Sequence, residues 1–127
     1  MSNPSDLKYT ESHEWVRDNG DGTATVGITH HAQEALGELV YVELPDAHRN
    51  VKANDACAVV ESTKAASDVY APIDGEIVSV NEALPNEPQL VNEAPFGEGW
   101  LFKIRIADPA QLQRLMSSAD YDKSIGA

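Results

Sequence analysis

The chain has very little cysteine: a single residue, Cys57, among 127. One thiol can form neither an intramolecular disulfide nor a cysteine-rich metal site. Its neighbours in the run 56–60 are small and apolar, so we expect a core thiol on a buried strand. No apolar run approaches the length needed to cross a bilayer, and the N-terminal residues lack an import or secretion signal. We therefore expect a bacterial cytoplasmic protein with no membrane partner.

Basic residues are also scarce. Nine Lys and Arg stand against 21 Asp and Glu, which gives a net charge of −12. Such a surface repels phosphate backbones, so nucleic acid is not expected as a partner. The same charge attracts basic patches on other proteins, although solubility alone is a sufficient reason for it.

Motifs for catalysis and for metal binding are missing as well. The chain has neither a zinc-protease motif nor paired CxxC motifs, and Gly97-Glu-Gly99 precedes an expected strand instead of a helix. The adjacent His30 and His31 would point about 100° apart on a helix. Ser12-His13-Glu14 contains the right residue types for a hydrolase, but members of a triad normally meet through the fold. We expect no catalytic residue and no metal ligand.

Short apolar–polar alternations dominate the chain and predict strands. The expected strands cover residues 7–9, 14–17, 23–28, 39–44, 56–60, 69–71, 76–80 and 100–106. The turn signal at 18–22 joins two of them in a hairpin. Residues 61–68 are expected to be a polar connection, and 81–99 a long irregular loop.

Helix signals are few and lie mostly near the end of the chain. Thr29 is placed to cap a short helix that ends at Gly37. Asp108, with a proline after it and Gln111 three residues on, predicts the start of a C-terminal helix with a capping box. A last helical turn near Ser118 would pack back on the domain. The helix that begins at Asp108 would have an apolar face: Leu112, Leu115 and Met116.

The elements together predict a mainly β fold, a small sandwich or flattened barrel with short additional helices and a C-terminal helix. No linker separates two parts, so residues 1–127 are expected to form one domain. Its β-rich core would span about 23–106, and its helical segment about 108–125.

Lys64 stands out because of its position. It is one of five lysines and the only basic residue between Lys52 and Lys103. The polar segment around it lies between two β-rich runs, which places the amine at the exposed tip of a hairpin. An exposed lysine is protonated at neutral pH, so acylation of it requires an enzyme.

The segment 59–77, VVESTKAASDVYAPIDGEI, closely resembles the lipoyl-attachment segment of the glycine cleavage system H-protein family. The resemblance extends over about residues 7–125. Two positions depart from the family pattern: His48 replaces a glycine, and Thr63 replaces a valine. Further motifs of the family are His13–Val16, Val26–Thr29, Ala32–Gln33, Leu36–Gly37, Leu44–Pro45, Val80–Asn81, Leu90–Asn92 and Gly97–Trp100.

The resemblance implies a lipoyl/biotinyl-type barrel-sandwich with lipoate bound covalently to Lys64. It implies a carrier that takes the aminomethyl group of glycine from the P-protein (glycine decarboxylase) to the T-protein (aminomethyltransferase). The L-protein (dihydrolipoyl dehydrogenase) then reoxidises the carrier. A lipoate ligase or lipoyl transferase would attach the group, and the carrier is expected to be a monomer and not an enzyme.

The resemblance also implies roles for other residues. Glu61 and Gly75, three residues before and eleven after the lysine, match the positions by which a modifying enzyme recognises related lipoyl domains. Ser12, Glu14 and Asp68 match positions where the loaded arm lies against the protein surface.

Three alternatives remain open. One is an H-like protein that relays lipoyl groups to other complexes. A biotin carrier is disfavoured, because that family has methionines on both sides of its lysine, whereas Thr63 and Ala65 flank Lys64. The third is a hydrolase that uses Ser12, His13 and Glu14.

Overall fold

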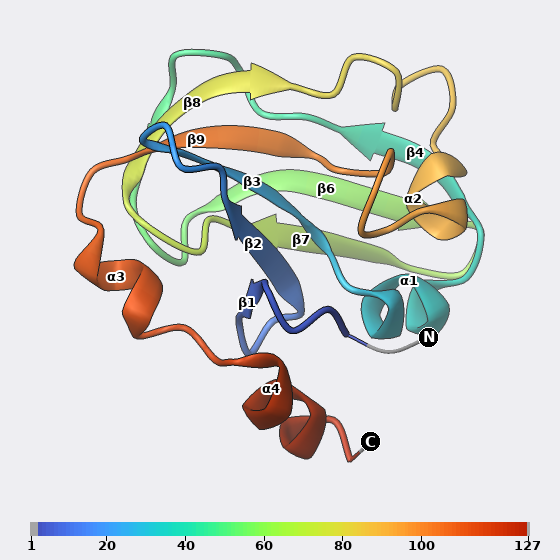
Figure 1. The fold of residues 1–127 in the computed structure, drawn as a ribbon. Coiled ribbons are helices and arrows are strands. Elements are labelled where there is room, and N and C mark those ends of the chain that lie inside the picture. The colour runs from blue at the N-terminus through green and yellow to red at the C-terminus, as the bar shows by residue number, and fades with distance from the viewer. Residues whose placement is uncertain (1–2, 127) are drawn as a thin grey trace.

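The apolar–polar alternations of the sequence form two antiparallel sheets, with short helices at their margins (Figure 1). The structure is a computed structural model, and it describes residues 3–126. The strands are β1 (Lys8–Tyr9), β2 (Glu14–Asp18), β3 (Thr23–Ile28), β4 (Leu39–Glu43), β5 (Asn50–Val51), β6 (Ala56–Ser62), β7 (Ala66–Tyr70), β8 (Gly75–Val80) and β9 (Phe102–Ile106). The helices are α1 (His30–Leu36), α2 (Leu90–Glu93), α3 (Ala110–Gln113) and α4 (Ser118–Ser124).

The two sheets differ in size. The larger has six strands in the order β1-β2-β3-β9-β8-β5, and the smaller has three in the order β4-β6-β7. Buried aliphatic and aromatic residues from both sheets form one core cluster, which includes Val26, Val60 and Phe102. Cys57 belongs to this cluster, as expected for a packed thiol, and burial raises its pKa to about 12. The predicted mainly β sandwich with helical additions is confirmed.

A second, smaller cluster joins the two ends of the chain. Leu7, Tyr9 and Trp15 pack against Tyr121 of α4. The rings of Tyr9 and Tyr121 stack with their centroids 4.8 Å apart. The predicted return of the C-terminal segment onto the domain is therefore confirmed, and it holds α4 against β1.

Two local predictions hold in detail. The hairpin of β2 and β3 turns through Gly20 and Gly22, which both have positive φ. The side chain of Thr29 accepts a hydrogen bond from the backbone N–H of Ala32, and α1 ends at Gly37, whose φ is 88°. Glycine is needed there because other residues rarely adopt this backbone conformation.

Other predictions were wrong at their boundaries. The polar connection expected at 61–68 is only a tight turn, because β6 runs to Ser62 and β7 begins at Ala66. Cross-strand pairing between Glu61 and Ala66 continues the ladder through residues that their polarity had assigned to a loop. The loop expected at 81–99 contains α2.

The C-terminal helix also differs from the prediction. The Asp108 side chain accepts from the backbone N–H of Ala110, as expected for a cap, but α3 is only four residues long. Gln111 does not complete a capping box, since its side chain accepts instead from the backbone N–H of Asp74. The tertiary hydrogen bond from Asp74 to Gln111 therefore replaces the local hydrogen bond of a capping box.

His48, which departs from the family pattern, has a φ of 69°. The chain thus keeps a left-handed conformation that suits glycine and places an exposed histidine in it.

Candidate functional site

Lys64 lies at the tip of the β6–β7 hairpin, where its side chain is exposed. The turn is held from within by Ser62. The backbone N–H of Ser62 donates to the carbonyl of Ala65 at 2.8 Å, and its hydroxyl accepts from the N–H groups of Lys64 and Ala65. A rigid turn thus presents the amine at one end of the molecule.

Gly37 provides space for the stem of Lys64. A Cβ added at Gly37 would lie 3.3 Å from Cε of Lys64. Asn92 fixes this glycine, because its side-chain amide donates to the Gly37 carbonyl and its oxygen accepts from the N–H of Leu39, both at 2.9 Å. The motifs Leu36-Gly37 and Leu90–Asn92 therefore meet beside the lysine.

Glu61 lies near the same tip, on β6. It is half-buried and pairs across the sheet with Tyr41 on one side and Ala66 on the other. The hairpin therefore places Glu61 close to Lys64.

Gly75 lies elsewhere. It begins β8 in the six-stranded sheet, beyond the end of β7 that is remote from Lys64. A Cβ at this position would lie 2.1 Å from the backbone oxygen of Arg105 and 2.8 Å from Cγ1 of Ile104. The close approach of β9 therefore excludes any side chain at Gly75.

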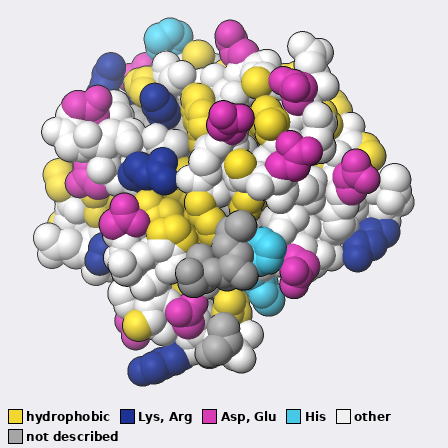
Figure 2. All heavy atoms as spheres, turned by 45° about the vertical axis from the view of Figure 1, so that its right-hand side comes forward, with side chains coloured by type: hydrophobic (Ala, Val, Ile, Leu, Met, Phe, Trp, Pro, Cys, Tyr) yellow, Lys and Arg dark blue, Asp and Glu magenta, His cyan; other side chains and the backbone are white. Residues whose placement is uncertain are grey.

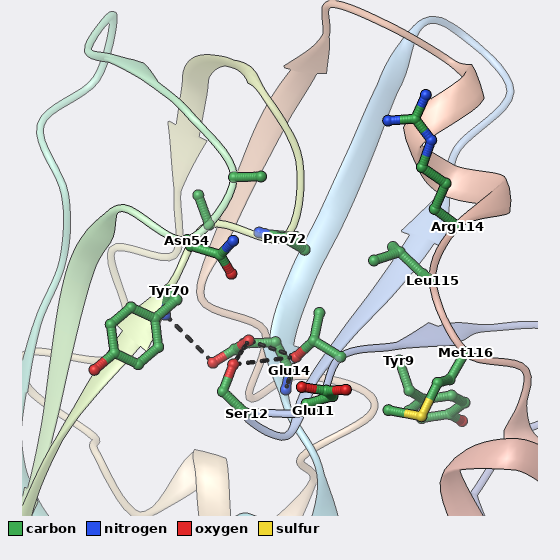
Figure 3. A pocket seen from close by; sticks show the side chains of 13 residues that line it. Tyr9, Glu11, Ser12, Glu14, Asn54, Tyr70, Pro72, Arg114, Leu115 and Met116 are labelled. Carbon is green, nitrogen blue, oxygen red and sulfur yellow. Dashed lines mark hydrogen bonds between the residues drawn. The ribbon is translucent and has the colours of Figure 1, made fainter.

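A cleft of about 590 Å³ opens beside β7 (Figure 3). Its walls come from the turn before β2, from the end of β7 and from the segment after α3. Ser12 and Glu14 belong to its lining, whereas Asp68 does not. The lining residues are Tyr9, Thr10, Glu11, Ser12, Glu14, Ala53, Asn54, Tyr70, Ala71, Pro72, Arg114, Leu115 and Met116.

Glu14 is the buried acid of this cleft, with only 1% of its surface exposed. The hydroxyls of Thr10 and Ser12 donate to Oε1, at 2.5 and 2.7 Å, and the backbone N–H of Tyr70 donates to Oε2 at 3.3 Å. Burial raises the pKa of the carboxyl group, and these hydrogen bonds partly oppose the rise. No Lys or Arg pairs with Glu14 among the ion pairs of residues 3–126.

Asp68 lies on β7 between the lysine and the cleft. It is exposed, and it pairs with Val59 of β6. From Ala66 to Tyr70 the strand rises about 13 Å, so the two features are separated by roughly that distance plus the turn. Of the three residues expected near a loaded arm, Ser12 and Glu14 are in contact, and Asp68 lies along the path from Lys64.

The sequence did not single out Thr10 and Tyr70, which complete the surroundings of Glu14. Thr10 reaches the carboxylate because the turn before β2 folds back on itself. Tyr70 is 56 positions away and contributes only a backbone N–H, for which no sequence signal exists.

The hydrolase alternative finds no support in the geometry. The ring of His13 is not hydrogen-bonded to Ser12. Its Nδ1 lies 2.8 Å from the hydroxyl of Tyr121, which is also hydrogen-bonded to Thr29. Ser12 donates to Glu14 instead, so the three neighbours in sequence do not form a proton relay.

Within residues 3–126, no group of three or more His, Cys, Asp or Glu side chains is placed to hold a metal ion. No helix in the part of the chain that the structure describes is long and apolar enough to span a membrane.

These features define a class of protein: a carrier domain, in which a small β-sandwich presents one lysine on a rigid turn. Known proteins specify the class further. The family model for the glycine cleavage H-protein matches residues 7–127. The chain belongs to the glycine cleavage H-protein family.

Individual relatives agree with this assignment. The glycine cleavage system H protein of Pseudoalteromonas translucida is 58% identical over 126 residues, which cover 98% of each chain. That of Paraburkholderia xenovorans is 58% identical over the whole of both chains. The crystal structure of the H protein from Mycobacterium marinum superposes with a TM-score of 0.90 at 38% identity, over 98% of this chain and all of that one.

Family membership gives the chain its function. It is a carrier component of the glycine cleavage system and not a catalyst, and its cofactor is a covalently attached lipoate. The predicted family, carrier role and cofactor are confirmed.

Proposed function

We propose that Lys64 bears the lipoyl group and that residues 1–127 act as one carrier domain. The surroundings of the lysine suit such a group. The amine is exposed, the turn that carries it is fixed by Ser62, and Gly37 leaves room for the stem. The proposal depends on one observation, the exposed position of the Lys64 amine on this turn.

When attached, lipoate supplies a dithiolane that carries a one-carbon amine fragment and undergoes reversible oxidation. The chain itself supplies tethering, since a group held on a flexible stem stays at high effective concentration near the sites of successive partners. The partners in this proposal are the P-, T- and L-proteins, which the carrier visits in turn as a cytoplasmic monomer.

Recognition by the lipoate ligase or lipoyl transferase is assigned to Glu61. This half-buried residue lies on the strand that leads to the lysine. For Gly75 a role in recognition stays a prediction, since the backbone of Arg105 already requires a residue without Cβ.

The cleft is proposed to shelter the loaded arm. The amine cargo is a cation, and Glu14 is a buried carboxylate without a basic partner among the described ion pairs. A cation beside it would offset the cost of burying its charge, and the cleft walls would exclude water. Ser12 orients this carboxylate, and Asp68 flanks the path along β7.

The attachment site is tested by intact mass. Protein from its native host should show the mass of one lipoyl group, and Lys64→Ala should lose it completely, because no other amine lies on this turn. Lys52→Ala is the matched control and should keep the group. A biotin adduct, or lipoylation of the Lys64→Ala variant, would refute the assignment. Transfer of the group to other complexes would favour the relay function.

The cleft is tested by the lifetime of the loaded form without T-protein, measured as ammonia and formaldehyde release. Glu14→Ala and Asp68→Ala should shorten this lifetime, by about tenfold for the buried Glu14, since contacts to charged groups contribute about 1.5–3 kcal/mol. Glu11→Ala removes an exposed carboxylate from the same lining and is the control. Equal lifetimes for all variants would show that the arm stays in solvent.

A further inference from the structure

β4 contains a bulge beside the lysine turn. Leu39 pairs with Ser62 and Tyr41 with Glu61, so Val40 is an extra residue without a partner of its own on β6. Side chains of an unbroken strand alternate between faces, but the bulge turns two in succession outward. Val40 is 54% exposed and Tyr41 47%, whereas Leu39 and Val42 are buried. Within residues 3–126, Val40 and Tyr41 are the large hydrophobic residues that remain exposed.

This apolar pair lies close to Lys64. Tyr41 pairs with Glu61, and Leu39, which precedes Val40, pairs with Ser62; Glu61 and Ser62 are the last two residues of β6 before the turn. Facing side chains of an antiparallel pair are about 5 Å apart. Figure 1 shows the start of β4 and the β6–β7 turn at the same side of the molecule. β4 is also an edge strand of its sheet, so one side of its backbone has no neighbouring strand among the residues that the structure describes.

Three carboxylates lie on the same face of the sheet as Tyr41. On the outer face of the three-stranded sheet, one row contains Tyr41, Glu61 and Ala66, and the next contains Glu43, Val59 and Asp68. None of the ion pairs found in the described residues involves these three carboxylates. Figure 2 turns this side of the molecule forward and shows acidic side chains spread over it. A complementary surface would have an apolar recess with a basic rim.

We propose that Val40 and Tyr41 form the docking patch for the enzyme that attaches the lipoyl group. The proposal rests on Lys64 as the attachment site. Attachment forms an amide bond between Nζ of Lys64 and the lipoyl carboxyl carbon, as an activated acyl donor loses its leaving group and the amine loses a proton. A bare lysine stem is short, so this enzyme must come against the residues around the turn. Partners that act later can reach the dithiolane at the end of a much longer arm.

The test uses the unmodified full-length chain and a purified lipoyl-attaching enzyme. The double variant Val40→Thr/Tyr41→Thr keeps two residues that favour strands and removes the apolar surface. We expect its Kd for the enzyme, measured by calorimetry, and the KM of attachment each to rise about tenfold, with kcat unchanged. The Tyr41→Phe variant keeps the apolar surface and should behave as the wild type. A circular dichroism melt of each variant checks its fold.

Two results would overturn the proposal. One is an unchanged Kd and KM in the double variant. The other is a larger rise in KM for the P- or T-protein, tested with the same variant after lipoylation, because the patch would then belong to a later partner. If Lys64→Ala still gained a lipoyl group, the attachment site would be wrong whatever the patch showed.

Discussion

At the scale of single residues, His13 connects the cleft to the rest of the molecule. It lies between Ser12 and Glu14 and has a φ of 73°, an uncommon conformation for a residue other than glycine. Its ring is hydrogen-bonded to Tyr121, and its carbonyl accepts from the N–H of Thr29. Such a backbone persists when its surroundings fix it, so these contacts hold the turn that supplies Ser12 and Glu14.

The ionisation of His13 should make stability depend on pH. Burial and the neighbouring His31 lower the pKa of His13 from its ordinary value of 6.5. As pH falls from 6.5 through the lowered pKa, the unfolded chain takes up a proton that the folded chain resists, so this contribution to stability is lost. We therefore expect wild type to lose unfolding free energy relative to His13→Asn over this range. The measurement is denaturant unfolding at a series of pH values.

His48→Asn is the matched control, because His48 also has positive φ but an exposed ring. It should follow the wild type across the range. Parallel curves for wild type and His13→Asn would show that the half-buried ring of His13 does not govern this dependence.

At the scale of elements, α4 acts as a clamp on β1. Ser117 caps the helix by accepting from the N–H of Asp120. Just before it, Met116 and Tyr9 exchange two backbone hydrogen bonds of 2.9 Å. Tyr121 then stacks on Tyr9 and reaches His13. The last residues of the chain therefore help to fix the turn that lines the cleft.

Removal of this cap should loosen the clamp. Ser117→Ala should lower the free energy of unfolding by about 1 kcal/mol, since the N–H of Asp120 loses its partner. Amide hydrogen exchange should quicken within α4. Ser118→Ala changes the next residue, which makes no capping contact, and should leave both values near wild type. Similar exchange in the two variants would mean that packing of Tyr121 alone holds the helix.

At the scale of the whole molecule, the chain has a net charge of −12, and as a carrier it must meet partner proteins repeatedly. The lysine turn and the cleft are separated along β7. In the proposed function, a mobile arm on Lys64 would therefore have to cross this distance to reach the cleft. The acidic surface gives long-range attraction to basic partner surfaces, and this attraction is screened by salt.

Partner encounters should therefore weaken as salt is added. We expect the apparent KM of the P-protein for the lipoylated chain to rise between low ionic strength and 0.15 M, where the Debye length is about 8 Å. An uncharged osmolyte at matched viscosity is the control and should have little effect. A KM independent of salt would indicate that docking depends on apolar contacts.

The sequence by itself determined what depends on local order. Alternation predicted the strands of residues 3–126 except β5, Thr29 and Gly37 bounded α1 correctly, and the family motifs around Lys64 identified the carrier. These signals lie within a few residues of one another, so they can be read along the chain. Polarity misled at 61–68, because residues at a hairpin end can pair in a ladder and still face solvent.

Only the tertiary structure decided the contacts between distant segments. It joined Glu14 to the backbone of Tyr70, placed Tyr121 behind His13, and brought β9 so close to Gly75 that no side chain fits. The bulge that exposes Val40 likewise arises from pairing between β4 and β6. Such contacts depend on sheet register and on how the chain ends return, and these are set by packing of the whole core and not by any local pattern.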